Sequence, residues 1–318
     1  MPPSPPTKPV SPRLAGWIVF AMLAMVAVPA GVTLHMVRAP ATLNIPSNPT
    51  PHGYTWSLLL FIIPIAVIAG WFLPSEGLDI PQRAFWRTIR VLVPAGFALD
   101  FFCAHRFFDF PNPDATLKIP AWALHGPVPI EEYVFYFTGF ITILLLYVWL
   151  DEFWLAAYNV PDYPAEARKI SRLLQFHPAS ALLGVAAIVA AVAYKKVFSA
   201  TPQGLPEYFT ILVVGGLIPS AGFFPTVRPF INWRALSLTL FIILLVSLFW
   251  EATLAIPYGW WGYQSRQMMG LSIRAWSGLP VEAVFVWIAV TYATVILFEV
   301  CKLWQASGRK VKDAFLGA

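Results

Sequence analysis

Two pairs of carboxylates are the residues of this 318-residue chain whose spacing points most directly to chemistry. Asp100 precedes Glu131 by 31 residues, and Glu251 precedes Glu282 by the same interval. All four lie in or beside strongly apolar segments, where a carboxyl group is costly and usually faces an interior cavity with a partner. Burial beside other acids favours the protonated carboxyl, which is the form that a general acid needs. The pattern predicts proton transfer inside an apolar site.

A structural role is the alternative for each acid at a helix start. Glu131 and Glu132 follow Pro129, and acids in a first helical turn interact favourably with the helix dipole. The repeated 31-residue spacing favours the functional interpretation for Glu131 and Glu282. Glu132 has no acidic counterpart, because Ala283 stands at that position, so we expect Glu132 to be structural or supportive.

The elements that must position these acids are membrane helices. The chain is 58% hydrophobic and only 12% charged, whereas soluble domains carry about 25% charged residues. It contains apolar runs of about 17–25 residues, the length that crosses roughly 30 Å of hydrocarbon. The runs lie near 14–34, 55–73, 87–104, 130–150, 177–194, 207–225, 235–255 and 281–304. The expected fold class is an all-α integral membrane protein with about eight transmembrane helices.

The chain resembles itself when it is shifted by 151 residues. Arg83-Ala84 then falls on Arg234-Ala235, and Pro129-Ile130-Glu131 falls on Pro280-Val281-Glu282, with no gap between about 53 and 150. Four helices in each half would leave both halves in the same orientation. We therefore expect two parallel four-helix repeats, related by a pseudo-two-fold axis along the membrane normal.

In such a bundle the four acids reach a similar depth. Asp100 and Glu251 lie toward the ends of the third and seventh helices, and Glu131 and Glu282 lie at the starts of the fourth and eighth. A helix that ends on one face and a next helix that starts there place these groups on the same side. The pseudo-two-fold axis can then gather them near the centre.

We divide the chain into a disordered Pro-rich tail (1–13), a first membrane repeat (14–150), a cytoplasmic linker (151–175), a second membrane repeat (176–304) and a basic cytoplasmic tail (305–318). The run at 14–34 is expected to be a retained helix, because it is long for the apolar core of a cleaved signal. Of the 21 Lys and Arg residues, 14 lie on the side of the termini and 7 on the other. The positive-inside rule then places both termini in the cytoplasm. We expect a multi-pass protein of the inner membrane of the cell.

Aromatic side chains are abundant in and beside the segments that connect these helices. One interpretation is an interfacial belt. The other is a wall of ring faces that stabilises a carbocation. The candidates for that wall are Phe101, Phe135, Trp250, Trp260 and Trp261.

The sequence predicts neither a metal site nor a bound cofactor. His105 and Asp109 stand four residues apart, but a salt bridge in a loop accounts for them more simply than a metal does. Dinucleotide, phosphate-loop and zinc-protease motifs are absent from the sequence. The two cysteines, Cys103 and Cys301, have no metal-ligand spacing. Because no Lys/Arg cluster sits on a soluble module, nucleic acid is not an expected partner.

Two helix starts resemble those of a known family. The segments Gly126-Pro-Val-Pro-Ile-Glu131-Glu132 and Gly278-Leu-Pro-Val-Glu282-Ala283 are similar to the paired Pro-x-Glu-Glu motifs of the membrane-integral lycopene cyclases. That family occurs as heterodimeric subunits in some bacteria and as a fused two-repeat domain in archaea and fungi. The stretch from Trp250-Glu251 to Tyr263 resembles its second repeat, and the resemblance covers roughly 53–150 and 205–301.

The resemblance implies an intramolecular lyase of carotenoid biosynthesis. In such an enzyme an acid protonates the terminal double bond of a linear polyene, a carbocation closes the ring, and a base removes a proton without redox change. Carried over by residue, Glu131 and Glu282 are the acid/base candidates, Glu132 stands beside the first, and Asp100 and Glu251 come second. The implied partners are membrane lipid and an apolar carotenoid or isoprenoid substrate taken from the bilayer.

Two alternatives stay open at this point. A carotenoid hydratase, or another isoprenoid-modifying enzyme, would begin with the same protonation of a terminal double bond. A transporter built from two parallel repeats would also carry acids in the middle of the bundle. A transporter predicts a polar path open at both sides, whereas a cyclase predicts an apolar cavity open to lipid and closed to water.

Overall fold

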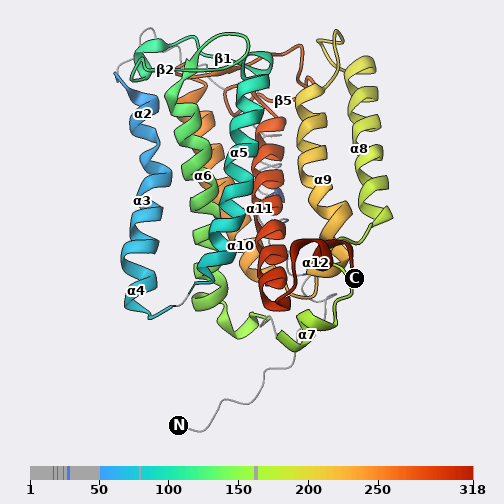
Figure 1. Ribbon diagram of the computed structural model, residues 1–318. Helices are drawn as coiled ribbons and strands as arrows, with labels where there is room; N and C mark the ends of the chain where they lie inside the picture. Colours follow the sequence, from blue (N-terminus) through green and yellow to red (C-terminus); the bar gives the residue numbers. More distant parts are fainter. Residues whose placement is uncertain are drawn as a thin grey trace.

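A computed structural model describes residues 17, 20, 24, 27, 28, 51–78, 80–160 and 164–317. Within this part of the chain, seven helices are long and apolar enough to cross a membrane, and they stand side by side as one bundle (Figure 1). They correspond to the seven apolar runs predicted from 55–73 onward. Of the eighth run, at 14–34, only residues 17, 20, 24, 27 and 28 are described, so the structure does not test it as a span.

Three spans make up the first part of the bundle. The first span joins α2 (Gly53–Ser57), α3 (Leu59–Val67), the π-helical η1 (Ile68–Phe72) and α4 (Leu73–Ser75). The second is α5 (Gln82–Phe107), and the third is α6 (Ile130–Trp149), which continues into the π-helical η3 (Leu150–Trp154). Pro64 lies inside α3 and Pro94 inside α5, as is tolerated in membrane helices whose neighbours satisfy the freed carbonyl groups.

Four spans make up the rest. They are α8 (Pro178–Val197), α9 (Glu207–Val227), α10 (Trp233–Trp250), which continues into the π-helical η5 (Glu251–Ala255), and α11 (Glu282–Ser307). The linker carries the short helices η4 (Ala156–Tyr158) and α7 (Pro164–Lys169), and α12 (Val311–Leu316) follows the last span. Arg309 holds α12 near the linker, because its guanidinium donates to the backbone carbonyls of Ile170 and Arg168.

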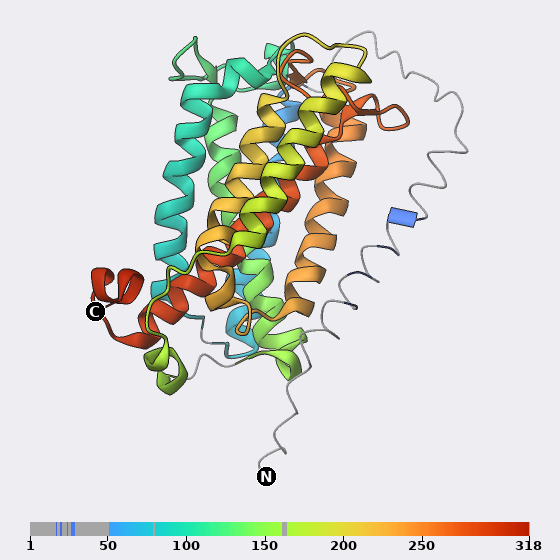
Figure 2. The same ribbon diagram turned by 90° about the vertical axis from the view of Figure 1, so that its right-hand side faces the viewer.

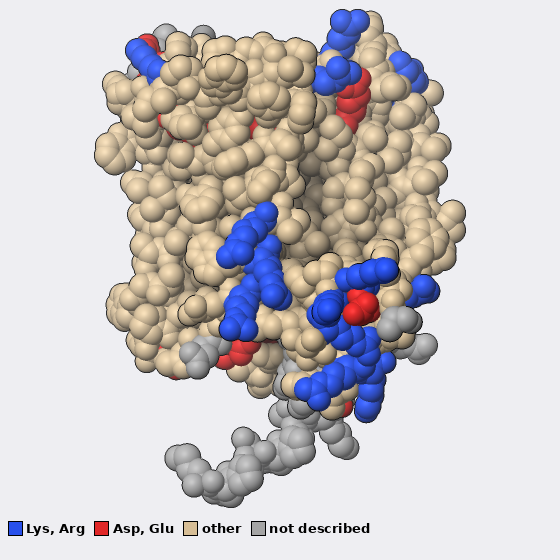
Figure 3. Space-filling view, in the orientation of Figure 1, with Lys and Arg blue, Asp and Glu red and all other residues tan. Residues whose placement is uncertain are grey.

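The two ends of the bundle differ in structure. At one end, three short antiparallel pairs close the loops: β1 (Phe108–Asp109) with β4 (Gly262–Tyr263), β2 (Pro120–Ala121) with β3 (Val128–Pro129), and β5 (Ser272–Ile273) with β6 (Leu279–Pro280). The 3-10 helix η2 (Pro113–Ala115) lies in the first of these loops. We call this end the strand side. The opposite end carries α7 and α12, and we call it the basic side, because Lys and Arg side chains gather toward it (Figures 1 and 3).

The core of the bundle is centred on α6 and α11. Over the 18-residue apolar stretch of each span, these two have the largest buried shares of the seven, 67% and 50%. By contrast, only 17% of the α8 span is buried, and α8 packs at the periphery against α9 (Figure 2). Side chains that face both central helices are therefore the ones best placed to form an enclosed site.

Candidate functional site

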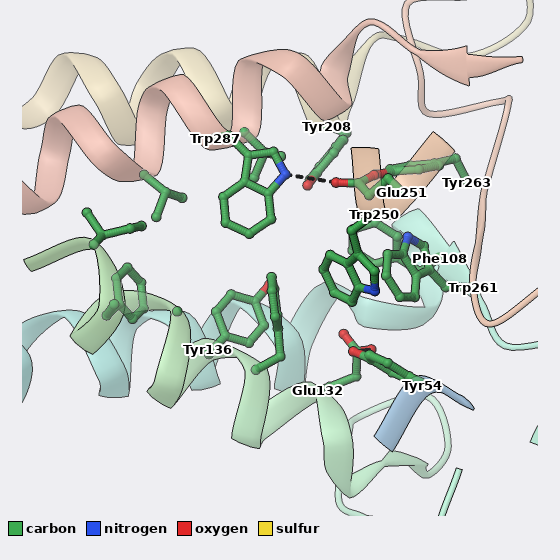
Figure 4. A pocket seen from close by; sticks show the side chains of 16 residues that line it. Tyr54, Phe108, Glu132, Tyr136, Tyr208, Trp250, Glu251, Trp261, Tyr263 and Trp287 are labelled. Atoms are coloured by element: carbon green, nitrogen blue, oxygen red, sulfur yellow. Dashed lines mark hydrogen bonds between the residues drawn. The ribbon is translucent and has the colours of Figure 1, made fainter. Parts of the chain in front are cut away.

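A cavity lies between the two central helices toward the strand side (Figure 4). Counted together with the open space at its mouth, its empty volume is about 700 Å³, and its lining is mostly apolar and aromatic. Six residues of α6 and three of α11 line it: Glu132, Phe135, Tyr136, Gly139, Phe140 and Ile143, and Val286, Trp287 and Val290. The remaining walls come from α2, α9, α10, β1 and the loop that carries β4, so both halves of the chain enclose the same space.

Glu132 is the carboxyl group on one wall of this cavity. It is only 8% exposed, and its Oε1 accepts a hydrogen bond of 2.6 Å from the Tyr54 hydroxyl. Asp100 on α5 lies close enough to interact electrostatically with Glu132. Both carboxyl oxygens of Asp100 are buried without a hydrogen-bond partner among the described residues. Two close carboxyl groups in an apolar site cannot both ionise cheaply, so this pair is suited to hold and donate one proton.

Glu251 is the carboxyl group on another wall. Its Oε1 accepts a hydrogen bond of 2.8 Å from the Trp287 indole nitrogen, and its Oε2 accepts one of 2.6 Å from the Tyr263 hydroxyl. Tyr263 lies in β4, where burial and the neighbouring Glu251 hold the pKa of its phenol well above the usual value. The phenol therefore keeps its proton and remains a donor. Two donors are thus available to stabilise negative charge on Glu251.

Aromatic rings occupy the space between these two carboxyl groups. Figure 4 shows Trp250 and Trp261 between Glu132 and Glu251. The ring centroids of Trp250 and Trp261 are 4.8 Å apart, and those of Tyr54 and Trp261 are 5.0 Å apart. Ring faces attract cations, most strongly where water is excluded. A positive charge formed between the two acids would therefore be surrounded by π-systems.

Glu131 and Glu282, the first-ranked acids from the sequence, are buried but do not line the cavity. Oε1 of Glu131 accepts hydrogen bonds from the Thr55 hydroxyl (2.5 Å) and the Leu117 backbone N–H (2.7 Å). Oε1 of Glu282 accepts one from the Met269 backbone N–H (2.5 Å). Each of these acids therefore holds the loop that precedes its own helix.

The five predicted aromatic residues divide in a similar way. Phe135, Trp250 and Trp261 line the cavity. Trp260 lies behind it and stacks on Tyr54 with the ring centroids 6.3 Å apart. This packing needs Gly53, since a Cβ there would come within 2.7 Å of the Trp260 ring. Phe101 packs against Phe102 instead, at 5.0 Å.

Several ring-bearing residues of the site were not singled out from the sequence, among them Tyr54, Tyr136, Phe140, Tyr208 and Trp287. The 151-residue shift does carry a signal for two of them, because it places Tyr136 on Trp287. Gly96 on α5 makes room for the first of these rings, since a Cβ at that position would lie 2.7 Å from Cδ1 of Tyr136. Tyr54 and Tyr208 come from the first turns of other helices, and no spacing in the sequence connects them with the acids.

The site contains the groups needed for proton transfer. Within the described ranges, no group of three or more His, Cys, Asp and Glu residues could hold a metal ion. Compared with known proteins, the chain matches no protein-family model, no curated protein and no solved structure. The function is therefore argued from the geometry of the site.

Proposed function

We propose that the chain is a lycopene-cyclase-like membrane enzyme that closes the end group of a linear polyene by proton transfer. The observation that carries this proposal is the position of Glu132 and Glu251, which face one aromatic cavity from different walls. An acid and a base on two sides of an apolar space can add a proton at one carbon and remove one at another. The resemblance of the two helix starts to the cyclase family supports the same reaction.

In the proposed reaction the Asp100–Glu132 pair supplies the proton. The proton adds to the terminal carbon–carbon double bond, whose π electrons form the new C–H bond and leave a carbocation. A second double bond of the chain attacks this cation, so that a ring closes and the positive charge moves to a ring carbon. Glu251 removes a proton from the neighbouring carbon and a double bond forms again. The product is an isomer of the substrate, with no gain or loss of electrons.

The cavity stabilises the cation and keeps water away from it. The faces of Trp250 and Trp261 lie between the acids and can stabilise the positive charge. On the strand side, the β1–β4 pair joins Phe108 to Tyr263, and both side chains line the cavity. Water that reached the cation would add to it, and the reaction would then be hydration.

Glu131 and Glu282 have a positioning role in this proposal. Both are fully buried, and each accepts a backbone N–H from the loop before its helix. The first loop contacts α2, which carries Tyr54, and the second loop carries Trp261 and Tyr263. Both loops can therefore influence the position of cavity residues. Loss of either acid would therefore act on the site through loop position.

The proposal also includes a duplication of the helical bundle within the chain. A shift of 151 residues places the start of α5 at Gln82 on the start of α10 at Trp233, and it places β3 on β6. It also superposes the cavity-lining positions 135, 136 and 139 on 286, 287 and 290. We propose two parallel four-helix repeats with 14–34 as the eighth span. The basic side would then be cytoplasmic, together with both termini.

A proton-coupled transporter is the second candidate, because a separate buried polar cluster lies toward the basic side. Glu299 is fully buried, accepts a hydrogen bond of 2.9 Å from the Tyr147 hydroxyl and pairs with Lys302 at 3.2 Å. Ionisable groups toward both ends of a bundle are a feature of transport paths. The aromatic lining between Glu132 and Glu251 favours the enzyme.

Expression of the full chain in a lycopene-accumulating bacterium, followed by pigment analysis, tests the proposal. Conversion of lycopene to β-carotene or γ-carotene is the expected result. A hydroxylated acyclic carotenoid would instead identify a hydratase. Unchanged lycopene in cells whose membranes contain the folded protein would contradict both enzymes and favour the transporter.

A further inference from the structure

We propose that the linear substrate passes between the bilayer and the cavity through a side opening bounded by α5 and α9, which we call the α5–α9 passage. This inference rests on the proposed function in one respect, that the ligand is a linear polyene. Such a chain is longer than the cavity, so its tail must leave the bundle while one end group reacts. The structure offers a specific place for that exit.

The α5–α9 passage lies where the membrane-facing surface is hollowed between these two helices (Figure 3). Its wall is an apolar cluster of Phe107 from α5, Tyr208 and Leu212 from α9, and Met268. Six partly buried residues pack around this cluster: Cys103, Phe108, Ile211, Tyr263, Val286 and Ala289. Tyr208 and Val286 also line the cavity, so the passage and the cavity share a wall.

An ion pair bounds the passage toward the strand side. The Arg106 guanidinium on α5 donates from both Nε and Nη2 to the two carboxyl oxygens of Glu207 on α9, the second bond measuring 2.7 Å. The pair is partly exposed, with 54% of the Arg106 side chain accessible. It joins the two helix ends above the apolar wall, so the passage faces lipid and not the aqueous loops.

The interface that corresponds to the passage in the other half lies between α3 and α10, and it is filled with aromatic rings. The 151-residue shift places Leu212 on Phe61 and Val286 on Phe135. Phe61 is 1% exposed, and its ring centroid lies 5.4 Å from that of Phe135, 5.5 Å from that of Trp250 and 5.9 Å from that of Trp287. Smaller aliphatic residues stand at these two positions on the α9 side. At a third pair of equivalent positions the order is reversed, since Tyr208 corresponds to Ser57 and its ring lies 5.0 Å from that of Phe107. The smaller residues at Leu212 and Val286, together with the hollow in Figure 3, assign the opening to α5–α9.

The chemistry of the wall defines the occupant. Below the Arg106–Glu207 pair, the cluster that forms the wall is made of aliphatic, aromatic and sulfur-containing side chains. Such a surface offers no compensation for a charged or strongly polar ligand. It suits an extended hydrocarbon chain that lies partly in lipid, while the end group occupies the cavity.

Cys103 allows a direct test, because the chain has two cysteines and the other, Cys301, can be replaced by Ser. The Cys301→Ser protein, purified and reconstituted in phospholipid vesicles, is treated with a lipid-soluble maleimide. Labelling of Cys103 is followed by mass spectrometry with and without lycopene in the bilayer. We expect lycopene to slow the labelling several-fold. An unchanged rate in vesicles in which the protein converts lycopene would overturn the passage and leave the enzyme intact.

A steric variant adds a second measurement. Ile211→Trp places a large ring at the passage, and Val214→Trp places the same ring on the exposed face of the same helix. We expect Ile211→Trp to reduce lycopene conversion several-fold and Val214→Trp to leave it near the wild-type level. Equal conversion by both variants would contradict the passage. Protection of Cys103 by lycopene without any conversion by the wild-type protein would instead support the passage and count against the proposed reaction.

Discussion

The indole nitrogen of Trp287 donates a hydrogen bond of 2.8 Å to Glu251, so a residue of α11 fixes the carboxyl group at the end of α10. The same indole stacks on Phe61 with the rings 5.9 Å apart and inclined by only 10°. Trp287 therefore connects the proposed base with the aromatic cluster that fills the interface between α3 and α10. Its ring and its N–H have separate roles, which substitution can distinguish.

Trp287→Phe retains a ring but removes the donor to Glu251. A hydrogen bond to a charged group contributes about 1.5–3 kcal/mol. Because this bond helps to keep Glu251 ionised and therefore able to accept a proton, we expect kcat to fall about tenfold to a hundredfold. Steady-state kinetics in vesicles would measure this fall. Trp149→Phe is the matched control, because the buried indole nitrogen of Trp149 has no hydrogen-bond partner among the described residues; an equal loss in both variants would refute a specific role for the Trp287 N–H.

The neighbouring acids Glu131 and Glu132 give the sharpest pair of substitutions. Glu132→Gln removes the proposed proton donor from the cavity wall, and we expect a loss of at least about a hundredfold in kcat. Glu131→Gln keeps a side-chain oxygen that can still accept from Leu117 and Thr55. We expect it to lower the thermal midpoint slightly while turnover stays within a few-fold of wild type. The reverse order of effects would return the catalytic role to Glu131, as the sequence alone ranks it.

The same contrast applies to the second half of the chain. Glu251→Gln removes the proposed base, so conversion should fall by at least about a hundredfold. Glu282→Gln weakens the bond to the Met269 backbone N–H, and its main effect should be on stability. Thermal unfolding in detergent and pigment conversion in membranes, measured on both variants, separate the two roles. A loss of conversion in Glu282→Gln as large as that in Glu251→Gln, without destabilisation, is the result that this account does not allow.

Phe61→Leu tests whether the aromatic rings around Phe61 keep the interface between α3 and α10 closed. Loss of a buried ring should destabilise the bundle by about 1–3 kcal/mol. The variant places at position 61 the same residue type that stands at the equivalent position, Leu212. We therefore expect a second, weaker route for the substrate to open beside α3. Lycopene should still protect Cys103 from labelling, because the α5–α9 passage is unchanged. The second route would appear as partial rescue of conversion in the Ile211→Trp background. No rescue in a folded double variant would mean that the aromatic filling at Phe61 does not decide the side of entry.

Much of the helical architecture follows from the sequence, because apolar length is a strong and local signal. The runs near 87–104 and 235–255 correspond to the longer helices Gln82–Phe107 and Trp233–Ala255, and the differences lie at polar ends where the hydropathy signal fades. The shift of 151 residues also places α5 and α10 in register. The short strand pairs were not predicted, since two-residue strands leave no alternating pattern.

The site was harder to predict, for a geometric reason. Glu131 and Glu132 are adjacent in sequence, but successive residues of an α-helix point about 100° apart around its axis. One of them therefore faces the loop and the other faces the cavity. The repeated spacing indicates which positions are equivalent, but the direction of each side chain depends on how the helices are rotated against their neighbours. Tyr54 and Tyr208 line the cavity because of how their helices pack against the neighbouring helices, which no spacing in the sequence indicates.

The central claim is that a proton supplied from the wall of the cavity starts ring closure. The most direct measurement is the mass spectrum of the carotenoid that the purified protein forms from lycopene in vesicles equilibrated in D2O. The account predicts a cyclic product that carries one deuterium for each ring closed in a first turnover, and no such product from Glu132→Gln. A cyclic product without deuterium, or equal deuterium incorporation by Glu132→Gln, would contradict it.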